Sequence, residues 1–333
     1  MGTRPTSHDV ARAAGVSQST VSFVFTGRAG ISDATREKVL RAASDLGYRP
    51  NLAARAMRTR RTGRLAIVVP IASAIPLTLI PGAVAAAAQA GYVVEVVSLP
   101  QDPDARSERV TEVQDSGQYE GVLAFTPLPA SASPADGPVT LAAGEFDEEM
   151  HATGEFTDAQ PVAAMIERLA DLGHRRFLHI AGPDRFPSAR ARREAYLETI
   201  ERLGVSSLGV VDGDWSGEDG EAAVSALPDD ARPLAVIAAN DVIATGAIRA
   251  AVRRGWTLPG DMSITGWDDH LQSAFLSPSL TSVRQDRERL GAYSMQRLIA
   301  AVRGEEAPPR PADLLTIQWR ESTAAPGVPP RRA

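Results

Sequence analysis

Small polar side chains in residues 6–26 have the types and the spacing needed to read the edges of DNA bases. Two short helices are predicted here, because Thr6 can cap the first, Gly15 permits a tight turn and Ser17 can cap the second. Their shared inner face carries Val10, Ala11, Ala14, Val21 and Val24. The outer face of the second helix keeps Gln18, Ser19, Ser22 and Phe23. A short helix held by a partner helix in this way is the major-groove reading element of helix-turn-helix proteins, and the alternative is an ordinary helical hairpin in a core.

A third helix is predicted over residues 32–46, where Ser32 can cap the start and Gly47 can end the helix. Its apolar stripe is expected to hold Val39, Leu40, Ala43 and Leu46. The three helices make a small head of residues 1–49 with little core of its own. Residues 50–63 follow as a basic, Ala-rich segment that begins with proline. Because so short a helix is marginal without packing partners, we expect this linker to become helical only on binding.

Positive charge is concentrated at one end of the chain. Residues 1–64 hold 12 Lys and Arg against 4 Asp and Glu, whereas the remainder holds 23 against 37. A basic head on an acidic body indicates that the head binds phosphates while the body stays in solution.

Residues 64–333 alternate between strand and helix patterns, which predicts parallel sheets covered by helices on both faces. Strands are expected at residues 65–69, 92–97, 121–125, 177–181, 208–211, 234–238 and 263–266. Helical stripes are expected at residues 76–90, at 165–172, and at Ile243, Ala247, Ile248, Ala251 and Val252. This length allows two domains, so the predicted fold is a small all-α helix-turn-helix head followed by a two-lobed α/β core with Rossmann-like lobes. A ligand cleft is expected at the strand ends.

Several classes of function are disfavoured by the sequence. The absence of cysteine excludes a disulfide framework and a thiolate metal site, and the five histidines show no metal-ligand spacing. An acidic cluster at Glu145, Asp147, Glu148 and Glu149 has no obvious acid–base partner, and there is no P-loop, nucleophile elbow or dinucleotide-binding motif. We therefore expect no enzyme, no cofactor and no metal site. The lack of a long apolar span and of a signal peptide predicts the cytoplasm and no membrane partner.

Several strings resemble the lactose-repressor/galactose-repressor family of bacterial transcription regulators. In the head and linker they are DVARAAGVSQSTVS, ISDATREKVLRAASDLGYRPN and AARAMRT. In the body they are LGHRRFLHIAGP, AANDVIATGAIRAAVRRGWTLPGDMSITGWDD, SPSLTSVRQD and RESTAAP. The resemblance implies a DNA-binding head at 1–49, a hinge at 50–63 and a periplasmic-binding-protein-like effector-binding and dimerisation core at 64–333. It places the first lobe at about 64–158 and 288–317, and the second at about 159–287 and 318–333.

The function implied by this resemblance is that of an allosteric repressor. We expect a homodimer, associated with the nucleoid, that a small sugar releases from a palindromic operator of carbohydrate-utilisation genes. The alternatives are a regulator that needs a co-repressor with a non-sugar ligand, a solute-binding receptor, and an enzyme with a nucleic-acid-binding appendage. The tail after Arg320 carries no leucine heptads, so no tetramer is expected.

The resemblance also implies which residues touch the operator. They are Thr6, Ser17, Gln18, Ser19, Thr20, Ser22, Phe23, Arg28, Asn51, Ala54, Arg55, Met57 and Arg58. Gln18 can pair with adenine through two hydrogen bonds. Phe23 either contacts a thymine methyl or folds back on the head. Met57 stands where the family has a hinge leucine that wedges into the minor groove, and the alternative is an exposed methionine on a flexible linker.

Ligand contacts are expected from Ser73, Arg192, Trp215, Asn240 and Asp268. Asn240 and Asp268 follow apolar strands, where doubly wound folds bind their ligands, although both side chains could instead cap strand ends. The match to the family is weaker over residues 70–160, where the string from Ile71 to Pro76 replaces the usual motif after the first strand.

The remaining two candidates rest on the resemblance. Arg192 matches the arginine that clamps the ligand in this family, and its guanidinium offers a fork of donors. Arg190 or Arg193 could serve instead. Trp215 matches an aromatic residue that lines the sugar pocket in lactose-type members, and plain packing is the alternative.

Overall fold

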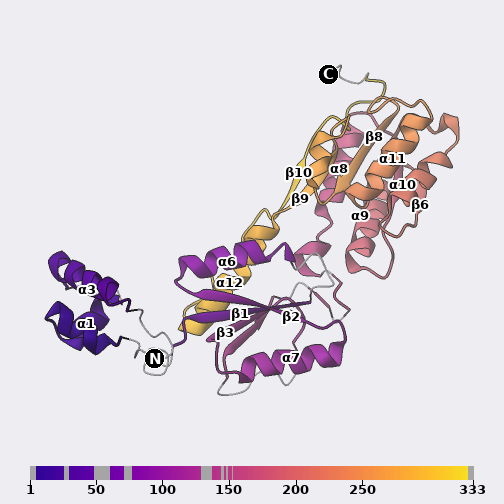
Figure 1. Cartoon of the computed structure of the whole chain (residues 1–333). Coiled ribbons are helices and arrows are strands. Elements are labelled where there is room, and N and C mark those ends of the chain that lie inside the picture. Colours follow the sequence, from indigo (N-terminus) through magenta and orange to yellow (C-terminus); the bar gives the residue numbers. More distant parts are fainter. Residues whose placement is uncertain are drawn as a thin grey trace. The chain divides into compact units, whose positions relative to one another are not determined.

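The computed structural model divides into two compact units, the head (residues 1–63) and the core (residues 64–333), shown in Figure 1. Within them, the structure describes residues 5–25, 30–48, 61–70, 77–128, 137–143, 146–147, 149–151 and 153–328. The predicted site residues that lie outside these ranges are Arg28, Asn51, Ala54, Arg55, Met57, Arg58 and Ser73.

Three helices form the described part of the head: α1 (Ser7–Ala14), α2 (Gln18–Phe25) and α3 (Asp33–Asp45). The predicted caps are present, with Thr6 before α1, Ser17 before α2 and Ser32 before α3. Gly15 ends α1 at a φ of 61°, a left-handed conformation that favours glycine. One small cluster of buried side chains holds the helices together, and it contains Val10, Ala11, Ala14, Val21, Val24, Val39, Ala42 and Ala43.

The predicted inner stripe of α3 was wrong at two positions. Leu40 and Leu46 remain 47% and 40% exposed, and Ala42 is buried instead. Residues 39, 42 and 43 share one side of a helix with 3.6 residues per turn, whereas residue 40 lies about 100° away from residue 39.

The first lobe of the core is built on a four-stranded parallel sheet in the order β2-β1-β3-β4. Its strands are β1 (Arg64–Pro70), β2 (Val93–Leu99), β3 (Gly121–Ala124) and β4 (Val139–Ala142). Helices α6 (Ile80–Gln89) and α12 (Arg287–Arg303) pack on one face, and α7 (Pro103–Asp115) packs on the other (Figure 1). Both faces of β1 are therefore buried, as expected for a parallel sheet.

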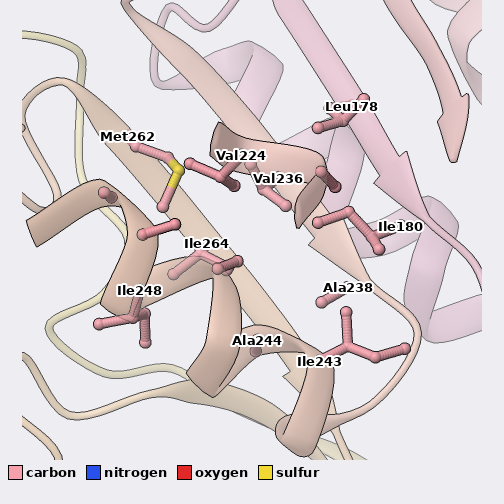
Figure 2. Close-up of a cluster of buried hydrophobic side chains, with 14 of the residues drawn as sticks. Leu178, Ile180, Val224, Val236, Ala238, Ile243, Ala244, Ile248, Met262 and Ile264 are labelled. Carbon is pink, nitrogen blue, oxygen red and sulfur yellow. The ribbon is translucent and has the colours of Figure 1, made fainter. Parts of the chain in front are cut away.

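The second lobe contains a six-stranded sheet in the order β10-β9-β8-β7-β5-β6. Its strands are β5 (Arg176–Ile180), β6 (Ser206–Val211), β7 (Leu234–Ala238), β8 (Met262–Trp267), β9 (Thr281–Gln285) and the antiparallel β10 (Leu315–Gln318). Its helices are α8 (Gln160–Asp171), α9 (Pro187–Leu203), α10 (Gly217–Ser225) and α11 (Asp241–Arg253). Figure 2 shows strand residues such as Ile180, Val236 and Ile264 packed against Ile243 and Ile248 of α11. The described residues also form three short 3-10 helices, η1 (Gly154–Thr157), η2 (Asp229–Ala231) and η3 (Leu271–Phe275).

Glycine allows two helix pairs in the core to pack backbone against backbone. A Cβ atom on Gly246 of α11 would lie 1.8 Å from the carbonyl oxygen of Gly217 in α10. A Cβ atom on Gly82 of α6 would lie 1.7 Å from the carbonyl oxygen of Glu288 in α12. No side chain fits at either position unless the helices move apart.

The expected strands all occur, β4, β9 and β10 occur in addition to them, and the other departures concern helices. The helix expected from residue 76 begins at Ile80, and Val252, expected inside the stripe of α11, is 57% exposed. The chain returns to the first lobe as α12, and β10 then pairs with β9. The last crossing between the sheets therefore comes before Leu315, earlier than the boundary expected near residue 317.

Candidate functional site

The start of α1 is closed by a reciprocal pair of caps. The Thr6 Oγ1 accepts a hydrogen bond from the Asp9 backbone N, and the Asp9 carboxylate accepts from the Thr6 backbone N at 2.9 Å and from its hydroxyl at 2.7 Å. These hydrogen bonds, led by the one from the backbone of Thr6, lower the pKa of Asp9. Thr6 is thus committed to the cap in the structure, and its predicted contact with DNA remains a prediction.

Small hydroxyl side chains surround the N-terminus of α2. The Ser17 Oγ accepts from the Thr20 backbone N at 3.1 Å and lies 2.7 Å from the Ser19 Oγ and 2.8 Å from the Thr20 Oγ1. The Gln18 Nε2 donates to the Ser7 Oγ at 2.9 Å. This exposed cluster places several donors and acceptors at one helix end, which is the arrangement that a helix needs to read base edges in the major groove.

The other predicted contacts on α2 are less exposed. Ser22 and Phe23 are half-buried, whereas Ser17, Gln18 and Ser19 are exposed. Partial burial of Phe23 is compatible with both roles considered from the sequence, so its contact with a thymine methyl stays a prediction.

Asn240 and Asp268 lie at the carboxyl ends of β7 and β8, as predicted. The Asn240 Oδ1 accepts from the Ile243 backbone N at 2.8 Å, so this side chain caps α11. Asp268 has a φ of 99°, and its Oδ1 accepts from the Arg287 Nη2 at 2.7 Å. Asn240 therefore acts as a cap, the alternative to ligand binding raised by the sequence. Asp268 instead pairs with Arg287 in the first turn of α12.

Arg192 is the arginine of α9 that turns inward. Its Nη1 donates to the Ala239 carbonyl oxygen at 2.7 Å, and its guanidinium lies 4.0 Å from the centroid of the Trp267 ring. Arg190 instead bonds the Asp184 carbonyl oxygen at 2.6 Å, and Arg193 bonds the carboxylate of Asp212. Burial lowers the pKa of Arg192 to about 10, which still leaves it protonated at neutral pH.

Trp215 packs closely on the second lobe. A Cβ atom on Gly182 would lie 2.3 Å from the Trp215 ring, so glycine makes room for the indole. The Trp215 ring meets Phe186 edge-on at 5.6 Å between centroids, and Phe186 also meets His151 at 4.6 Å. Phe186 and His151 were not predicted as site residues. The sequence offered one indication that Phe186 lies near the other candidates: it comes just before Pro187, which can begin a helix.

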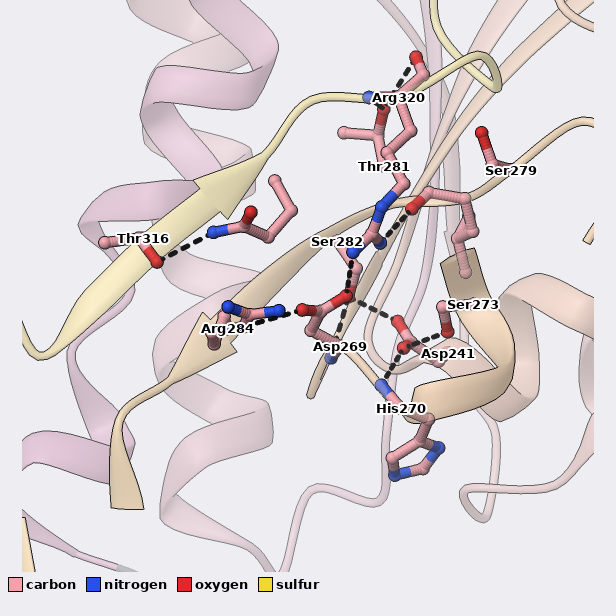
Figure 3. A network of polar contacts seen from close by, with 12 residues as sticks. Asp241, Asp269, His270, Ser273, Ser279, Thr281, Ser282, Arg284, Thr316 and Arg320 are labelled. Carbon is pink, nitrogen blue, oxygen red and sulfur yellow. Dashed lines mark hydrogen bonds and ion pairs between the residues drawn. The ribbon is translucent and has the colours of Figure 1, made fainter. Parts of the chain in front are cut away.

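A buried carboxylate holds the loop that carries Asp268. The Asp241 Oδ2 accepts from the His270 backbone N at 2.8 Å and from the Ser273 Oγ at 2.6 Å, and its Oδ1 accepts from the Ser282 Oγ at 2.5 Å (Figure 3). Burial raises the pKa of Asp241, although the three hydrogen bonds oppose the shift. Asp241 thus fixes the loop that follows Asp268, the predicted ligand contact, through hydrogen bonds from His270 and Ser273.

A second carboxylate ties the end of the chain to the same loop. Asp269 accepts from the Arg284 Nε at 2.9 Å and pairs with the Arg320 Nη2 at 2.6 Å, as Figure 3 shows. Arg320 belongs to the segment after β10. The string RESTAAP, which begins with this arginine, therefore helps to hold the loop that contains Asp268 and Asp269.

None of the helices in the described part of the chain is both long enough and apolar enough to cross a membrane. Among the described side chains, no group of three His, Asp or Glu residues could hold a metal ion.

Comparisons with known proteins agree with this architecture. Residues 6–51 match the model for "Bacterial regulatory proteins, lacI family", and residues 166–323 match a periplasmic binding protein-like domain. The transcriptional regulator CelR of Thermobifida fusca is 31% identical over 92% of this chain and 94% of its own length. The transcriptional repressor CytR of Escherichia coli (strain K12) is 30% identical over 91% of each chain.

Solved structures of similar proteins have the same fold over nearly the whole chain. The lac repressor dimer bound to operator and an anti-inducer is 26% identical, with a TM-score of 0.68 over 97% of this chain and 100% of its own. The CelR–cellobiose complex is 28% identical, with a TM-score of 0.59 over 96% of this chain and 100% of its own. The chain therefore belongs to the lacI family of bacterial regulatory proteins and is a DNA-binding transcriptional regulator.

Proposed function

We propose that this regulator is a homodimeric repressor of carbohydrate-utilisation genes, released from a palindromic operator by a small sugar. The observation that carries the proposal is the pairing, in one chain, of the capped α2 with a lobe that gathers Arg192, Asn240 and Asp268 at its strand ends. The solved complex of CelR with cellobiose supports a sugar as effector. The proposed divisions are the head at 1–49, the hinge at 50–63 and the core from 64.

The experiment that tests this function selects DNA from a random pool with the full chain and then adds sugars. A palindromic consensus with half-sites about one helical turn apart is expected, and one sugar should release it. Enrichment without two-fold symmetry would contradict the dimeric operator model, and release by no sugar would contradict the inducer.

Two alternatives predict different results. A co-repressor with a non-sugar ligand would strengthen operator binding instead of releasing it. A solute-binding receptor would select no DNA. We further propose that the chain has no catalytic activity and acts in the cytoplasm at the nucleoid, because its relatives are named as regulators of transcription.

Gln18→Ala is expected to cost about 1–3 kcal/mol on the selected operator and to relax the choice of base at one position. The reason is that the Gln18 amide can donate and accept at an adenine edge once it leaves the Ser7 hydroxyl. Fluorescence anisotropy with operator and random duplexes measures both effects.

Ser7→Ala is the matched control, because it removes the same intramolecular hydrogen bond and keeps the amide. Operator affinity should stay within about twofold of wild type. An equal loss on operator and on random DNA for Gln18→Ala would make Gln18 a backbone contact only.

The proposed homodimer needs an interface, and exposed apolar side chains in the described part of the core could form it. Leu271 and Phe275 of η3 are each 80% exposed, and Val242 and Val252 on the outer side of α11 are also exposed. The hydrogen bonds of Asp241 hold η3 against the start of α11. Exposed apolar patches of this kind mark interaction sites.

We expect the double variant Leu271→Asp, Phe275→Asp to shift the protein from dimer to monomer in sedimentation at micromolar concentration. Each buried Leu or Phe contributes about 1.5–3 kcal/mol and two-fold symmetry uses each twice, so the dimer dissociation constant should rise at least about 1,000-fold. Leu197→Asp on α9, also an exposed leucine, is the control that should remain dimeric. A double variant as dimeric as wild type would place the interface elsewhere.

A further inference from the structure

Arg192 carries a buried charge that the described chain does not neutralise. The residue is 6% exposed, and no carboxylate among the residues that the structure describes lies within 4.0 Å of its guanidinium. Its contacts are the Ala239 carbonyl oxygen and the faces of Trp267 and Trp215. A guanidinium removed from water without a carboxylate at contact distance is costly, so a counter-charge from outside the chain would be stabilising.

The neighbouring carboxylates are already engaged. Asp268 gives its Oδ1 to the Arg287 Nη2 at 2.7 Å, and Arg287 is further held by the Gln285 Oε1 at 2.8 Å. Asp241 accepts three hydrogen bonds from its own surroundings. Arg192 and Arg287 thus share one carboxylate between them, which leaves positive charge in excess beside Asp268. Burial lowers the pKa of Arg192, Asp268 opposes this shift, and the nearby Arg287 adds to it.

The unused atoms next to this charge are donors. Among the described residues, neither the buried Arg192 Nε nor its Nη2 has a hydrogen-bond acceptor, so one edge of the guanidinium fork, the open edge, is unpaired within this part of the chain. The Trp267 Nε1 is also buried and finds no acceptor in the part of the chain that the structure describes. A carboxylate or phosphate matches the open edge of an arginine with two parallel hydrogen bonds.

We propose that the effector carries an anionic group, a carboxylate or a phosphate, which the open edge of Arg192 binds with Arg287 beside it. The class of ligand is therefore a sugar acid or a sugar phosphate rather than a neutral sugar. This inference rests on the proposed function, because it concerns the effector of the same site, and it adds Arg287 as a specificity-determining residue that the sequence analysis did not single out.

The test compares matched ligands on the full chain by thermal shift. The sets are glucose, glucuronate and glucose 6-phosphate; galactose and galacturonate; ribose and ribose 5-phosphate; and cellobiose with cellobionate. The carboxylate and phosphate arms separate the two sources of negative charge. An acidic ligand should bind at least tenfold more tightly than its neutral partner. The difference should appear as a higher melting temperature, because a ligand that binds only the native state stabilises it.

Inorganic phosphate gives a probe that does not depend on the sugar ring. At constant ionic strength, sodium phosphate should raise the melting temperature relative to sodium chloride, and Arg192→Met should lose that rise. Arg287→Gln should weaken binding of the acidic ligand at least tenfold. Arg289→Gln, an exposed arginine of the same helix, is the control that should leave binding within twofold.

The outcomes separate this inference from the proposed function. Binding of a neutral sugar as tight as that of its acid would overturn the anionic effector and leave the sugar-responsive repressor in place. A phosphate effect that persists in Arg192→Met would overturn the assignment of Arg192. No shift with phosphate, with acids or with neutral sugars would overturn both the anionic group and the sugar effector.

Discussion

Arg192→Ala is expected to abolish the response to effector while operator affinity stays near that of wild type, which gives a permanently repressing protein. Arg192 lies in the core, whereas the operator is read by the head, so the substitution should remove the proposed ligand contacts and leave the DNA contacts unchanged. An effector that weakens operator binding 100-fold must bind the DNA-incompetent state about 2.7 kcal/mol more tightly than the DNA-bound state. Loss of the arginine fork removes the contacts from which this difference would arise.

The coupling that we propose begins with closure of the two lobes on the ligand. Closure would shift the first lobes against each other across the dimer and separate the hinge segments at 50–63, which would then lose helix. The heads would no longer keep the spacing of the two half-sites. Met57, with Arg55 and Arg58 beside it, is proposed to hold the hinge on the minor groove in the repressing state.

Operator binding by anisotropy, with and without the effector found in the screen, measures the Arg192→Ala result. Arg190→Ala is the matched control, because Arg190 is exposed and bonds only the Asp184 carbonyl oxygen among the described residues. It should respond to effector as wild type does. An Arg192→Ala protein that failed to bind operator without ligand would show that Arg192 supports the fold or that the ligand is a co-repressor.

Gly246→Ala is expected to lower the free energy of unfolding of the core by about 3 kcal/mol, at the upper end of what overpacking usually costs. The new Cβ atom would lie 1.8 Å from the Gly217 carbonyl oxygen, and this obstacle is backbone, which has no rotamer by which to escape. Helices α10 and α11 would have to separate. All four tryptophans lie in the core, so urea unfolding followed by tryptophan fluorescence reports this change directly.

Gly217→Ala is a control at the same contact. A Cβ atom on Gly217 would have its nearest neighbour, the Val242 carbonyl oxygen, at 3.6 Å, which is ordinary van der Waals contact. Its stability should stay within about 1 kcal/mol of wild type. Equal losses for both variants would mean that glycine is needed here for reasons other than the approach of the two helices.

Local signals in the sequence predicted the features that neighbouring residues decide. The caps Thr6, Ser17 and Ser32 and the glycine end of α1 form within a few residues, so their residue types reveal them. Seven strands of the two sheets were visible as apolar runs, as is typical of parallel strands buried between helices, whereas β4, β9 and β10 were not predicted. Helices such as α7, α9 and α12 were not predicted, since their many charged residues interrupt the apolar stripe.

The orientation of apolar side chains was harder to predict. Leu40, Leu46 and Val252 are as apolar as their buried neighbours, but the side on which another element packs decides which of them is covered. The same holds for Phe186, whose contacts with Trp215 and His151 join segments far apart in the chain.

The sequence by itself determined that this chain has a helix-turn-helix head and an α/β core, because short-range patterns of caps, glycines and apolar periods indicate both. It also pointed to Arg192, Asn240 and Asp268. Only the tertiary structure decided how these side chains are used: Asn240 caps α11, Arg192 is buried with no described carboxylate in contact, and Asp268 is held by Arg287. The physical reason is that charge pairing and desolvation depend on which elements meet, and α12 brings Arg287 to β8 from another part of the fold.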